Sequence, residues 1–88
     1  MEIEKIKTMT NLTGDEQTDF VTDWAEYAKL TLYEMGVSNK YINSENSSYI
    51  IAKIVTDLVE DGELSSTTNS MIATLRVNHP HSEDVGNV

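Results

Sequence analysis

The chain contains no cysteine, so disulfides, thiolate metal sites and cysteine nucleophiles are all excluded. It has only one proline and four glycines in 88 residues, which leaves little turn material for an all-β fold. Basic residues are scarce too: six Lys and Arg face 15 Asp and Glu, a net charge of −9. A protein that holds nucleic acid by neutralising phosphates needs a concentrated basic surface, so this class is excluded.

Long hydrophobic runs are also missing. No stretch approaches the roughly 20 apolar residues that span a bilayer, and the N-terminus lacks the layout of a signal peptide. We therefore expect an intracellular protein without membrane contact, and the lack of cysteine fits a reducing compartment. A chain of this size buries roughly 60 to 70% of its unfolded surface, a marginal amount, so oligomerisation is an expected source of stability.

What the sequence does have is helical periodicity. Apolar residues recur every three or four positions in four segments, 2–9, 16–35, 47–61 and 68–77. Gly36 and Gly62 follow the second and third of these, where a left-handed helix end is expected. The pattern predicts an all-α fold: a small bundle of three to four helices in a domain of residues 1–78, with 47–61 as the central helix. The remaining residues, 79–88, are expected to form a flexible tail.

The same periodicity predicts which side chains lie in the core or at an interface. The set consists of apolar residues at helical spacing on the predicted second, third and last helices: Phe20, Trp24, Ala28, Ile51, Ile54, Leu58 and Leu75.

Three patterns that resemble catalytic or metal sites fail on inspection. The acids from Asp57 onward would put Val59 and Thr68 at positions where a calcium loop needs oxygen ligands and a closing Glu. His79 and His81 flank Pro80 in the predicted tail, where no rigid element holds a third ligand. The abundant serines have no positioned base nearby. We therefore expect no enzyme activity, no metal and no cofactor.

Acidic residues concentrate at the start of the second predicted helix. Asp15, Asp19, Asp23 and Glu26 occur in a segment with no base before Lys29. Such a face contacts water, a basic partner, or DNA whose phosphates it repels, so that the DNA is not bound. These four acids, together with Arg76 in the last predicted helix, are the candidate channel-facing or partner-facing residues.

The order of these features is informative as a whole. A short helix precedes the break NLTGDE at 11–16, and the long helix contains AEYA at 25–28. A polar loop and an aliphatic helix follow, and GELSS at 62–66 leads into MIATLR at 71–76. Over residues 3–80 this order resembles the small all-helical head-tail connector, or adaptor, proteins of tailed bacteriophages.

The resemblance implies a structural subunit of a homo-oligomeric ring, usually dodecameric. Such a ring docks beneath the portal protein at the virion neck and leads to the next connector or tail protein, after synthesis in the host cytoplasm. DNA passes through its channel without sequence-specific binding. Family members often carry several bases in the closing segment, whereas Arg76 is the only one in that segment here. On this reading an acidic channel repels phosphates and lets DNA slide.

A second hypothesis comes from a different class of protein. A small acidic regulator, for example a DNA mimic, binds a basic protein surface. The size and net charge of this chain suit such a regulator as well as they suit a connector subunit. A mimic presents dense carboxylates over one face, however, while the acids here fall into runs interrupted by Ser, Thr and Asn. Both hypotheses describe a protein that acts through its surface.

Overall fold

The computed structural model describes residues 3–85, and these are all-helical, as predicted. No strand occurs among them, and the only β-type pairing is an isolated bridge between Val37 and Pro80. In order, the elements are α1 (Ile3–Thr10), the 3₁₀ turn η1 (Asp15–Gln17), α2 (Thr18–Glu34), α3 (Asn39–Ile42), η2 (Glu45–Ser47), α4 (Ser48–Asp61), α5 (Ser66–Asn78) and η3 (His81–Asp84). None of these helices is long and apolar enough to cross a membrane.

The described residues form five α-helices, against three to four predicted. The additional helix, α3, is a single turn inside the predicted loop 37–48. It forms because the hydroxyl of Ser38 accepts a hydrogen bond from the backbone N–H of Tyr41 at 3.1 Å, which caps the turn. The four longer helices lie close to their predicted positions. The largest differences are two residues: α2 begins later, at Thr18, because η1 occupies residues 15–17, and α5 begins earlier, at Ser66, where Ser65 is its N-cap.

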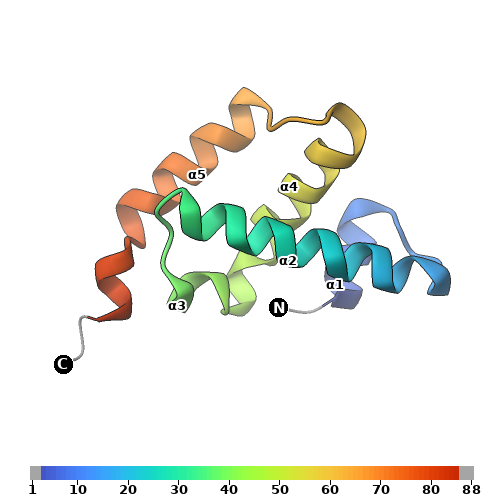
Figure 1. Cartoon of the computed structure of the whole chain (residues 1–88), viewed down its shortest axis with the longest axis horizontal. Helices are drawn as coiled ribbons and strands as arrows, with labels where there is room; N and C mark the ends of the chain where they lie inside the picture. The colour runs from blue at the N-terminus through green and yellow to red at the C-terminus, as the bar shows by residue number, and fades with distance from the viewer. Residues whose placement is uncertain (1–2, 86–88) are drawn as a thin grey trace.

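Helix α4 is the centre of the fold. It contacts α1, α2 and α5, and in Figure 1 α2 crosses in front of it while α5 and η3 form the edge opposite α1. The molecule is elongated, 42 Å long and 16 Å thick. A thin molecule built around one helix has a core about one layer of side chains deep, so much of every other helix remains at the surface.

The core is aliphatic and comes from all five α-helices of the described residues, with Val37 added from the loop between α2 and α3. α4 buries most of its apolar residues, and the small side chains of α2 allow close approach of the two helices. The buried apolar residues are Ile6, Val21, Ala25, Ala28, Leu32, Val37, Ile42, Ile50, Ile51, Ala52, Ile54, Val55 and Ile72. The core contains no aromatic ring, so its stability depends on close aliphatic contact.

Two glycines end helices as predicted. Gly36 has φ +102° and Gly62 has φ +75°, backbone conformations that residues with a Cβ adopt at a cost. At Gly36 a Cβ would also lie 2.6 Å from the side chain of Arg76, so this glycine lets α5 approach the end of α2.

The predicted flexible tail is not confirmed. Residues 79–85 lie against the α2–α3 junction: the backbone N–H of Ser38 donates to the carbonyl of His79 at 2.8 Å, and η3 follows. Residues 86–88, the rest of the predicted tail, lie outside the described part of the chain. The tail prediction failed because this segment is held by polar contacts, and apolar content was the criterion used.

Replacing a fully buried residue of α4 tests this description of the core. Ile54→Ala should lower the free energy of unfolding by about 2 to 5 kcal/mol, because it removes aliphatic contacts and leaves a cavity. Val59→Ala on the exposed side of the same helix should change it by less than about 0.5 kcal/mol. Urea unfolding followed by far-ultraviolet circular dichroism measures both values. Equal effects of the two substitutions would contradict the assigned orientation of α4.

Candidate interaction surfaces

The described residues contain no arrangement of three or more His, Asp or Glu that is suited to hold a metal ion. His79 and His81 are occupied in a different way, as stacking partners of tyrosines. Three regions stand out: a groove between α2 and α4, an apolar surface around Tyr49, and the docked C-terminal segment.

The first region begins with a row of aromatic rings on α2. Phe20, Trp24 and Tyr27 stand at helical spacing and contact one another edge to face, with ring centroids 6.3 and 6.0 Å apart. Phe20, predicted in the core or at an interface, lies outside the core with 41% of its surface exposed, and Trp24 is only partly buried. The residues of α2 that are buried are Val21, Ala25, Ala28 and Leu32, so the aromatic row lies at the edge of the buried face.

Beside this row the two helices leave an open groove of about 430 Å³. Its lining consists of Asp23, Trp24 and Tyr27 from α2, and Leu58 and Gly62 from the end of α4. Leu58, another predicted core or interface residue, is partly buried and forms the apolar floor on the α4 side. Two aromatic rings, an aliphatic side chain and one carboxylate make this groove suited to an apolar side chain that carries a positive neighbour.

The predicted acidic face lies next to the groove. Asp15, Asp19, Asp23 and Glu26 are all exposed. Lys29, the next base along α2, has its Nζ 3.8 Å from Glu26 Oε1. Tyr27 and Leu30, 55% and 54% exposed, interleave with the acids on the outer side of α2. The face is therefore acidic and apolar together, which favours contact with protein.

The second region surrounds Tyr49, which is 57% exposed. One hollow beside it, of about 280 Å³, is lined by apolar or uncharged residues that include Ile50, Met71 and Leu75. A second hollow, of about 210 Å³, is lined by Met9, Ala52 and Lys53 among others. We call the residues lining these two hollows the Tyr49 surface. It has no carboxylate in its lining, which is unusual in a chain with 15 acids.

The other predicted core or interface residues lie inside the protein or at this surface. Ala28, Ile51 and Ile54 are fully buried, and Leu75 is partly buried against the core where it lines one of the hollows. Arg76 of α5 is exposed, and its side chain lies over Gly36, just after the C-terminal end of α2. The four acids lie at 15–26, before and within the first half of the same helix. The structure therefore does not join Arg76 with the four acids in one site.

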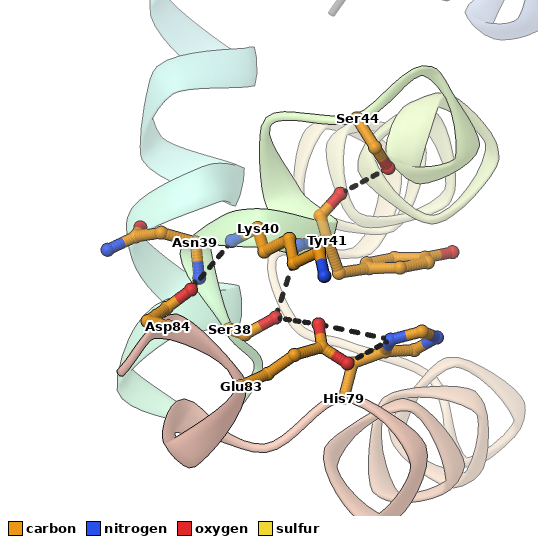
Figure 2. Close-up of polar contacts among 8 residues, drawn as sticks. All are labelled: Ser38, Asn39, Lys40, Tyr41, Ser44, His79, Glu83 and Asp84. Carbon is orange, nitrogen blue, oxygen red and sulfur yellow. Dashed lines mark hydrogen bonds and ion pairs between the residues drawn. The ribbon is translucent and has the colours of Figure 1, made fainter. Parts of the chain in front are cut away.

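The third region is the docked C-terminal segment, residues 79–85 (Figure 2). Asp84 caps α3: its two carboxylate oxygens accept hydrogen bonds from the backbone N–H groups of Asn39 at 2.9 Å and Lys40 at 2.8 Å. Glu83 accepts a hydrogen bond from the hydroxyl of Ser38 at 2.8 Å. These contacts join residues 45 positions apart, which no local pattern in the sequence reveals.

Histidine rings complete the docking of this segment. His79 stacks on Tyr41 at 4.6 Å between centroids and places Nδ1 3.0 Å from Glu83 Oε2. His81 stacks on Tyr33 at 4.2 Å, and its Nε2 lies 2.7 Å from the Tyr33 carbonyl oxygen, which accepts the hydrogen bond. The two histidines, which the sequence analysis placed in a flexible tail, are therefore structural contacts.

The carboxylates of the segment are stabilised in their charged form. The backbone N–H groups of Asn39 and Lys40 lower the pKa of Asp84. The hydrogen bond from Ser38 lowers the pKa of Glu83, and His79 lowers it further. Together these two contacts outweigh burial, which raises the pKa. Because both pKa values are lower in the folded protein, the docking is at full strength above the unfolded carboxyl pKa of about 4. It weakens as pH falls through the lower folded values.

A buried carboxylate, Asp57, connects α4 with α5. It accepts hydrogen bonds from the hydroxyl of Thr68 at 2.5 Å and from the backbone N–H of Ser65 at 3.1 Å, and Lys53 Nζ lies 3.8 Å away. Burial raises the pKa of Asp57, but these hydrogen bonds and the Lys53 charge outweigh it, so the pKa is lowered. The acid considered above for a calcium loop thus has a structural role, together with the cap that Ser65 provides for Thr68.

Comparisons of the chain with protein-family models, with curated proteins and with solved structures find no match. The surfaces described above and the order of the helices are the features of the protein that bear on its function.

Removing the Asp57 carboxylate tests its role between the helices. Asp57→Ala should lower the free energy of unfolding by about 2 to 3 kcal/mol, because the Thr68 hydroxyl and the Ser65 N–H lose a charged acceptor. The matched change Asp61→Ala, at an exposed position of the same helix, should cost less than about 0.5 kcal/mol. A double-mutant cycle with Thr68→Val should give a coupling energy above about 0.5 kcal/mol, and additive effects would contradict the contact.

The pH dependence of the docked segment can be followed at single residues. In nuclear magnetic resonance spectra, the amide signals of Asn39 and Lys40 should move as pH is lowered from about 4, because protonation of Asp84 weakens its acceptor oxygens. In Asp84→Asn this movement should disappear, while Ser82→Ala in the same turn should preserve it. Equal titration of both amides in wild type and Asp84→Asn would show that another group is responsible.

Proposed function

We propose that the protein is a structural head-tail connector subunit of a tailed bacteriophage, which forms a ring below the portal with other copies of itself. The observation that carries the proposal is the Tyr49 surface. Identical chains of net charge −9 repel one another, so they should meet through a surface without carboxylates. The Tyr49 surface has an apolar lining without acids and includes one base, Lys53.

The architecture supports the same proposal. The elements follow the order that the resemblance implies: a short helix, a break, a long helix, a polar turn, an aliphatic helix and a closing helix after Gly62. Exposed apolar side chains, among them Met9, Tyr49 and Val77, remain uncovered in a single copy. Contact with neighbours in a ring would bury such residues and add stability to a domain with a thin core.

The surface charge suits passage of DNA. The acidic face of α2 gives phosphates no cationic contact, so DNA would pass the ring without being held. The exposed Tyr27 and Leu30 among the acids favour this proposal over a DNA mimic, which needs carboxylates that are not interrupted by apolar side chains. In the proposed virion the ring lies at the neck, between the portal protein and the next connector or tail protein.

The proposal is tested by measuring the mass of the assembly. Native mass spectrometry of the chain, alone and with a purified portal ring, should detect a ring of many copies in at least the second sample. Tyr49→Lys should reduce assembly at least tenfold, because it places a charge in the apolar contact. Its circular dichroism spectrum should remain that of a helical protein, which shows that the variant still folds. A chain that stays monomeric in both samples would contradict the proposal.

Tyr27→Lys is the matched control. It replaces a tyrosine of similar exposure, 55% against 57%, and gives the same net charge as Tyr49→Lys. Assembly of Tyr27→Lys should equal that of the wild type, since Tyr27 lies in the groove and not on the Tyr49 surface. Equal loss in both variants would show that charge alone prevents assembly.

A further inference from the structure

The groove between α2 and α4 differs from the Tyr49 surface in its charge. Its lining includes the carboxylate of Asp23, and the exposed acids Glu26, Glu60, Asp61 and Glu63 stand within three positions of a lining residue. The lining residues fall in segments 23–27 and 58–62, which contain no Lys or Arg. The nearest base along the chain, Lys29, has its Nζ 3.8 Å from Glu26 Oε1. An apolar groove surrounded by an excess of negative charge attracts a ligand with the opposite charge.

We infer that this groove binds a cationic, amphipathic segment of a different protein, which inserts an aliphatic or aromatic side chain between Trp24 and Leu58. Lysines or arginines next to that side chain would face Asp23 and the acids around Gly62. Two aromatic rings and a leucine can cover such an anchor, and buried aromatic contacts dominate the energy of interfaces of this kind.

Other occupants fit the groove less well. A second copy would bring a further net charge of −9 to an acidic face, which charge repulsion opposes. Nucleic acid would place phosphates beside carboxylates. An uncharged apolar ligand would fill the groove but leave the acids around it without a counter-charge. A cationic amphipathic segment satisfies both the apolar lining and the charge.

This inference goes beyond ring formation and does not depend on it, because the groove and the Tyr49 surface are formed by different residues. The chain also contains a built-in reporter. Trp24 is its single tryptophan and lies in the groove wall, so the fluorescence of the unmodified protein reports on this site.

The test uses designed peptides of about 15 residues, long enough to form a helix on binding. The first combines lysine with leucine at helical spacing, the second replaces each leucine by alanine, and the third replaces each lysine by glutamate. The lysine–leucine peptide should change the emission of Trp24 saturably, with an affinity that falls as salt is raised. The other two peptides should bind at least tenfold more weakly, because each lacks one of the two required features.

Variants then locate the binding site, with a dye-labelled lysine–leucine peptide followed by fluorescence anisotropy. Tyr27→Lys and Asp23→Lys should weaken binding at least tenfold, while Tyr49→Lys, which has the same net charge as Tyr27→Lys, should leave it unchanged. Binding by all three at wild-type strength would place the peptide elsewhere and overturn the inference. Equal affinity for the lysine–alanine peptide would overturn it as well, since charge alone would then explain binding.

Two results separate this inference from the proposed function. If the emission of Trp24 depends on protein concentration without peptide, a second copy occupies the groove and the inference is wrong, although a ring is still formed. If the peptide results are as expected but the chain remains monomeric with the portal ring, the connector proposal fails and the groove assignment stands. Loss of peptide binding in Tyr27→Lys with normal ring assembly would support both.

Discussion

The burial of α4 is the constraint on which the other features of the protein depend. Its apolar residues form a broad stripe, and its intrinsic helix propensity is low because Ile and Val are β-branched. The helix is therefore stable only while α1, α2 and α5 cover it. In return, α4 is the element that all three of these helices share as a packing partner, although α1 and α2 also contact each other. Loss of its packing should therefore disturb both the groove and the Tyr49 surface, since α4 contributes residues to each.

Polar contacts set the positions that apolar packing leaves free. Aliphatic side chains hold α5 against α4, but the hydrogen bonds of Asp57 with Ser65 and Thr68 fix where α5 begins. At the other end of α5, Asp84 and Glu83 attach the C-terminal segment to α3. Each of these carboxylates has a lowered pKa because its partners donate to the charged form. Acidic residues that add to the net charge of the chain thus also order its helices.

The features that the sequence predicted well are those that arise from neighbouring residues. The spacing of Ile50, Ile54 and Leu58 predicted α4, and Gly62 predicted its end, because both depend on residues within a few positions. The docking of Glu83 on Ser38 could not be predicted in this way, since the partners are 45 positions apart and meet only after α2 and α5 have packed. Phe20 shows the same limit: its spacing matches that of Trp24, but exposure depends on the angle at which α2 crosses α4. The groove could not be predicted from the sequence either, because it forms where α2 and α4 meet. Its lining residues Trp24, Leu58 and Asp23 were nevertheless each identified as candidates.

The distribution of charge now has a structural explanation. Nine acids lie in segments 15–28 and 54–63, which form and flank the groove, whereas the lining of the Tyr49 surface has none. A protein that binds copies of itself and also a different, basic partner must keep these two contacts from competing. In the proposed assembly, charge would provide that separation: the acidic groove would repel other copies, and the apolar surface lacks the carboxylates that would attract a basic segment. The two surfaces are lined by different residues, so the excess of acids would then be the means by which a small chain distinguishes its proposed partners.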